Sequence, residues 1–90
     1  MDRETLAHID ENMICFDGLG EAIIGHGFCF QSHKDIAVYD YYKIIQIFMK
    51  DHEMSYDEAV EFIAFNVIGL YAGDQTPIVV VTDRPEEFGY

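Results

Sequence analysis

SYDEAVEFIAFNVIGLYA, residues 55–72, predicts the helix on which the rest of this chain packs. At 100° per residue, three charged residues share one narrow sector of that helix: Asp57, Glu58 and Glu61. Apolar residues, Phe62 among them, cover the other directions, so we expect several neighbours to bury this helix and make it the core element. Ser55 and Glu58 have the spacing of a capping box, and Gly73 predicts the helix end.

Two strands are predicted before this helix and one after it. The alternation in EAIIGHGFCF, residues 21–30, predicts a strand with Phe28 and Phe30 on one face and small residues on the other. A polar turn, QSHKD, leads to a second strand, DIAVYD, so these two strands are expected to pair as an antiparallel hairpin. The β-branched run IVVVT, residues 78–82, predicts a third and largely buried strand.

A second helix is predicted over about residues 41–51, with Asp40 as its N-cap. Its apolar stripe lies opposite three polar residues: Lys43, Gln46 and Lys50. The order strand, strand, helix, helix, strand predicts an α+β fold, a small three-stranded sheet with the two helices packed on one face. The second face would then be partly open, and Phe28 and Phe30 lying there favour self-association.

The 90 residues predict a single domain. We divide it into an acidic lead-in (1–16), a core (17–82) and a tail (83–90). No uncharged stretch is apolar and long enough for a membrane span, and the acidic N-terminus is unlike a secretory signal. We therefore expect a cytoplasmic protein without membrane contact, in which the two cysteines are reduced thiols.

The net charge of −12 is concentrated in two segments. Residues 1–21 carry six acids and Arg3, giving −5, and residues 51–61 carry five acids and no base, also giving −5. Such a field disfavours direct binding to nucleic acid and attracts a basic protein surface. The predicted partner-binding surface has an acidic rim and an apolar centre, formed by Asp51, Glu53, Asp57, Glu58, Glu61, Phe65 and Ile68.

The sequence contains no recognisable catalytic motif. Its histidines and cysteines lack the spacing of a zinc site, its glycine pairs do not complete a phosphate-binding loop, and no nucleophile lies in an elbow motif. We predict a non-enzymatic protein with no catalytic residue, metal or cofactor. Asn66, opposite the charged sector of the central helix, predicts a buried amide that either bonds loop backbone or, with Tyr71 and Thr76, lines a ligand pocket.

Three segments carry a resemblance to other proteins: DGLGEAIIGHG, AVYDYYKIIQIFM and MSYDEAVEFIAFNVIGLYAGDQTPI. Together they resemble a set of small acidic proteins from bacterial genomes, phages and prophages. The resemblance covers about residues 17–80, and FNVIGLYAGDQTP is its most specific part. It implies a phage or prophage context but no particular chemistry.

Charge and this context lead to one hypothesis: a phage-encoded anti-defence inhibitor, anti-CRISPR-like, that mimics nucleic acid and occupies a basic surface of a host protein. One alternative is a small-molecule or nucleotide-signal binder acting as a sponge, and another is a structural homodimer of unknown role. An anionic ligand would need positive groups, and near the middle of the fold only Lys34, Lys43 and Lys50 supply them.

Overall fold

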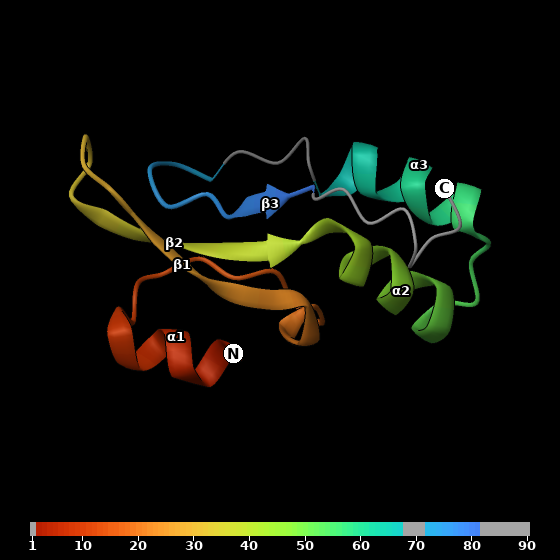
Figure 1. The fold of residues 1–90 in the computed structure, drawn as a ribbon, viewed down its shortest axis with the longest axis horizontal. Coiled ribbons are helices and arrows are strands. Elements are labelled where there is room, and N and C mark those ends of the chain that lie inside the picture. The colour runs from red at the N-terminus through yellow and green to blue at the C-terminus, as the bar shows by residue number, and fades with distance from the viewer. Residues whose placement is uncertain (1, 68–71, 82–90) are drawn as a thin grey trace.

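The computed structural model describes residues 2–67 and 72–81 (Figure 1). Its elements are α1 (Arg3–Ile9), the 3-10 turn η1 (Gly20–Ala22), β1 (Ile23–Cys29), β2 (Lys34–Asp40), α2 (Tyr41–Asp51), α3 (Tyr56–Asn66) and β3 (Ile78–Val80). The predicted α+β class is confirmed, and so is the order strand, strand, helix, helix, strand. The short helix α1 precedes these five elements.

The strands form one mixed sheet in the order β1–β2–β3. β1 and β2 make the predicted antiparallel hairpin, in which a bulge separates Ile23 from Gly25 and Ile23 lies opposite Tyr39. β3 pairs with β2 in parallel, so that Val79 lies opposite Tyr39. Parallel neighbours require a long connection, and α2 and α3 lie within it.

α2 supplies the largest group of buried side chains of any helix. Its first turn is capped by Asp40, whose carboxylate accepts the Tyr42 N–H at 3.0 Å. Its buried residues are Tyr42, Ile44, Ile45, Ile47 and Phe48. The helix contacts β2, η1 and α3, and Figure 1 shows α2 and α3 together beyond the carboxyl end of β2. α2, rather than the segment 55–72, is therefore the central helix of the fold.

α3 buries much less than the sequence predicts. Within the helix only Ala59 and Ile63 are buried, together with Val67 just after its end. Phe62, expected inside, is 38 % exposed and rests against Phe48 with 5.0 Å between the ring centroids. The expectation that several neighbours bury this helix is wrong: among the described elements α2 is the main neighbour of α3, and one neighbour covers only one stripe.

The start of α3 is as predicted, and its end is not. The Ser55 hydroxyl accepts the Glu58 N–H at 3.2 Å, and the Glu58 carboxylate accepts the Ser55 N–H at 2.9 Å, which completes the capping box. The helix ends at Asn66, and residues 68–71 lie outside the described residues. Gly73, with φ of 97°, begins a turn in which the Thr76 N–H donates to the Gly73 carbonyl.

Replacing Ser55 with alanine is expected to lower the free energy of unfolding by about 1 kcal/mol, because it removes the hydroxyl that accepts the Glu58 N–H. Ser55→Asp retains a side-chain acceptor and is the matched control, expected to stay close to the wild type. Urea unfolding followed by circular dichroism measures both. Equal stability of wild type and Ser55→Ala would contradict the assigned helix start.

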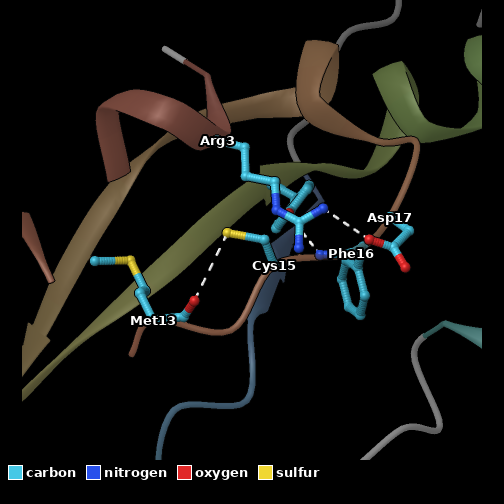
Figure 2. A network of polar contacts seen from close by, with 6 residues as sticks. Arg3, Met13, Cys15, Phe16 and Asp17 are labelled. Carbon is cyan, nitrogen blue, oxygen red and sulfur yellow. Dashed lines mark hydrogen bonds and ion pairs between the residues drawn. The ribbon is translucent and has the colours of Figure 1, made fainter. Parts of the chain in front are cut away.

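The N-terminal segment is held against β2 by Tyr39. The Phe16 N–H donates to the buried Tyr39 hydroxyl at 2.8 Å, and the two rings lie 4.9 Å apart. Burial raises the pKa of Tyr39 to about 12. Nearby, Arg3 forms an ion pair with Asp17 at 2.7 Å (Figure 2). This contact connects the start of α1 to the turn before η1.

A second contact connects the N-terminal segment to the loop before β3. Gln75 is buried, and its amide nitrogen donates to the Asp10 carboxylate at 2.9 Å and to the Asp35 carbonyl at 3.0 Å. Three separate segments therefore meet at one side chain. Among the described helices, none combines the length and the apolar character needed to cross a bilayer.

Candidate functional site

The predicted partner-binding surface lies on the outer side of α3 and at the end of α2. Its acidic residues are all exposed: Asp51, Glu53, Asp57, Glu58 and Glu61. Glu58, Glu61 and Phe65 follow one another at three- and four-residue steps, which places them along one face of the helix. Phe65 is 77 % exposed, and Ile68 lies outside the described residues. We call this surface the α3 acidic face.

No ion pair neutralises the carboxylates of the α3 acidic face within residues 2–67 and 72–81. The ion pairs there are Arg3–Asp17, Lys34–Asp74 and the 3.1 Å contact between His26 and Asp35. Hydrogen bonding from the Ser55 backbone N–H lowers the pKa of Glu58, so this carboxylate stays charged at neutral pH. Among the described residues, no opposite charge therefore compensates the negative field of this surface.

The α3 acidic face also contains exposed aromatic surface. Phe65 projects from the last turn of the helix, on the same side as Glu58 and Glu61. Phe62 lies at the edge of this face and is partly covered by Phe48. Apolar groups that are exposed together and surrounded by charge are typical of a protein-binding surface. Burying Phe65 in a partner would contribute about 1.5–3 kcal/mol.

The residues of the alternative ligand pocket have local roles. Asn66 is exposed, and its amide donates to the Phe62 carbonyl one turn earlier at 3.0 Å. The prediction of a buried amide is wrong, because α3 turns a different stripe inward. The Thr76 hydroxyl accepts the Ala72 N–H and donates to the Gly73 carbonyl, both at 2.7 Å. Tyr71 lies outside the described residues.

Metal-binding side chains do not gather at one place in the described part of the chain. There, no three His, Cys, Asp or Glu residues lie together in a way that could hold a metal ion. Cys15 and Cys29 are free thiols, and the Cys15 sulfur lies 4.0 Å from the Met13 carbonyl oxygen (Figure 2).

The structure also contains a cleft that the sequence did not reveal. It lies between η1 and α2 and has a volume of about 270 Å³. Its lining residues are Glu21, Lys43, Gln46, Ile47, Lys50 and Asp51. The sequence placed Lys43, Gln46 and Lys50 on one helix face, but the position of Glu21 opposite them depends on tertiary packing. We call this feature the η1–α2 cleft.

Comparisons with protein-family models, with curated proteins and with solved structures found no match to this chain. The structure alone therefore defines the class of this protein. It is a small α+β protein with a mixed three-stranded sheet, and α3 presents an acidic surface with exposed Phe65 outward.

Proposed function

We propose that this protein is a non-enzymatic binder whose α3 acidic face occupies a basic, nucleic-acid-binding surface of another protein. The supporting observation is Phe65, 77 % exposed on a helix whose exposed carboxylates have no ion-pair partner among the described residues. The resemblance to small phage and prophage proteins favours one form of this function, a phage-encoded anti-defence inhibitor of the anti-CRISPR type.

Binding in this way would use the carboxylates in place of phosphates. A groove that binds nucleic acid is lined by Lys and Arg, and an acidic protein competes for the same charges. Long-range attraction raises the association rate, while the apolar contact of Phe65 slows dissociation. The net charge of −12 supports such steering and makes the binding sensitive to salt.

A homodimer is the second candidate, and it is supported by the β1–β2 hairpin. Phe30 is 81 % exposed and packs edge-on against Phe28, with 5.4 Å between the ring centroids. Exposed aromatic pairs on a hairpin favour contact with another copy of the chain. Sedimentation of the wild type and of Phe30→Ser tests this candidate. We expect a dimer for the wild type and a monomer for Phe30→Ser. Monomers in both cases would contradict it.

Capture from bacterial lysate by the immobilised full chain tests the main proposal. We expect a captured basic protein that is released by moderate salt and that duplex DNA displaces from the immobilised chain. The double variant Asp57→Lys/Glu61→Lys should bind this protein at least about tenfold more weakly, because two attractive charges become repulsive. Glu58 is left intact so that the capping box is preserved.

The matched control is Glu4→Lys/Glu11→Lys, which changes the net charge equally at two exposed positions away from α3. At physiological salt the Debye length is about 8 Å, so distant charges contribute little, and this variant should bind like the wild type. If both double variants weaken binding to the same extent, only net charge matters and the α3 acidic face is not the site. A captured protein that DNA does not displace would contradict mimicry.

A further inference from the structure

We propose that the η1–α2 cleft binds a small molecule with one carboxylate or phosphate group, held between Lys43 and Lys50. The inference goes beyond the function proposed above, because it concerns a different site and a different kind of ligand. The volume of about 270 Å³ lies just below the range of about 300–1,000 Å³ typical of small-molecule sites. A small metabolite fits this volume.

One wall of the cleft is a single face of α2. Gln46 and Ile47 follow Lys43 by three and four residues, and Lys50 follows Ile47 by three. This spacing brings the four side chains to the same side of the helix. A rise of 1.5 Å per residue places the Cα atoms of the two lysines about 10.5 Å apart. The amide of Gln46 lies between them, and the nearly buried Ile47 supplies an apolar base.

Glu21, in η1, lines the same cleft, and η1 packs against α2. This contact fixes the position of the opposite wall. A second, wider and shallow surface depression adjoins the cleft, because Glu21 and Lys43 line both. A ligand larger than its anionic group therefore has room to extend toward α1.

Within the described residues, the two lysines of the cleft form no ion pair, although the protein is rich in carboxylates. The sequence contains 17 acidic residues, yet neither Lys43 nor Lys50 lies within 4.0 Å of a carboxylate in the described ranges. Arg3 and Lys34, by contrast, each form an ion pair. Each free ammonium has three donors, and charge-assisted hydrogen bonds to an anion are among the strongest that proteins make.

The acidic residues of the cleft restrict the ligand further. Glu21 and Asp51 line it together with the lysines, so a second negative group on the ligand would be repelled. Hydrogen-bond donors elsewhere on the ligand would instead find carboxylate acceptors. These charges favour a molecule with a single anionic group and amino or hydroxyl groups, and they disfavour polyanions.

Titration of the ¹⁵N-labelled full chain, followed by NMR, tests this proposal. The probes are inorganic phosphate and serine, which has one carboxylate, an amino group and a hydroxyl, with sodium chloride at matched ionic strength as the blank. We expect saturable shifts of the backbone amides of residues 20–22 and 43–51 with at least one probe. Stronger binding of phosphate points to a phosphorylated ligand, and stronger binding of serine points to an amino-acid-like one. Saturation by neither probe overturns the proposal.

Substitutions separate the cleft from general electrostatics. Lys43→Gln and Lys50→Gln should each weaken the binding of the better probe about tenfold, because each removes one charge-assisted contact. Lys34→Gln makes the same change of charge outside the cleft and should leave the affinity unchanged. Equal weakening by all three variants would show that only net charge acts, and would overturn the proposal. Circular dichroism confirms that each variant is folded.

Discussion

Replacing Ile45 with alanine is expected to lower the free energy of unfolding by about 2–5 kcal/mol. Ile45 is fully buried in α2, where its side chain belongs to the continuous core of the protein. Truncation removes apolar contacts and leaves a cavity that the neighbouring elements cannot fully close. Since small domains are stable by only about 5–15 kcal/mol, this one change removes a large part of the total. Urea unfolding at 25 °C provides the measurement.

Phe65→Ala is the control for this prediction, because it removes a larger side chain than Ile45 and does so from α3. Phe65 is exposed, so its truncation should change the free energy of unfolding by no more than about 0.5 kcal/mol. The contrast distinguishes a fold centred on α2 from one centred on α3. A greater loss from Phe65→Ala than from Ile45→Ala would contradict the arrangement described above.

Tyr39→Phe is expected to destabilise the protein by about 1–3 kcal/mol. The substitution keeps the ring in the core but removes the hydroxyl that accepts the Phe16 N–H, which is then left without this partner. The cost arises where the N-terminal segment meets β2, so we expect faster amide exchange in the residues around Phe16 as well. Urea unfolding at pH 7 measures the stability, and hydrogen exchange measures the local effect.

The same substitution should change how stability depends on pH. The pKa of Tyr39 is raised from 10 to about 12 in the folded protein, because burial disfavours the phenolate. The folded state therefore retains this proton more strongly than the unfolded state does. The stabilisation is complete below about pH 10 and is lost as the pH rises toward 12. Tyr39→Phe lacks this ionisable group, so its free energy of unfolding should fall less than that of the wild type between about pH 10 and pH 12.

Tyr56→Phe is the control for the pH prediction, because Tyr56 is exposed in the first turn of α3. It should keep the wild-type loss of stability between pH 10 and 12. If Tyr39→Phe and the wild type lose stability in parallel over that interval, the hydroxyl of Tyr39 does not have the buried environment assigned to it.

Features that depend on residues close together in the sequence could be predicted. The hairpin follows from the alternation of residues 21–30 and a short polar turn, and the start of α3 follows from the Ser55–Glu58 capping box. The N-cap Asp40 is correct for the same reason. In each case the stabilising contact spans only a few residues, so the pattern itself contains the information.

Features that depend on tertiary packing could not be predicted in this way. The apolar residues of α3 indicated burial on several sides, but exposed Phe62 shows that composition does not reveal how many neighbours a helix has. Asn66 is exposed for the same reason: α3 has fewer neighbours than its composition indicates. The η1–α2 cleft joins Glu21 to Lys43 and Lys50, and no pattern within either segment predicts that contact.

The parallel pairing of β3 has a consequence for the order in which the protein folds. The β1–β2 hairpin closes across a short turn, whereas Val79 reaches Tyr39 only after the intervening helices have been traversed. Closing a longer loop costs more chain entropy, and non-local pairing slows folding. The hairpin is therefore expected to form first, and β3 to join the sheet only after α2 and α3 have brought the chain back to β2.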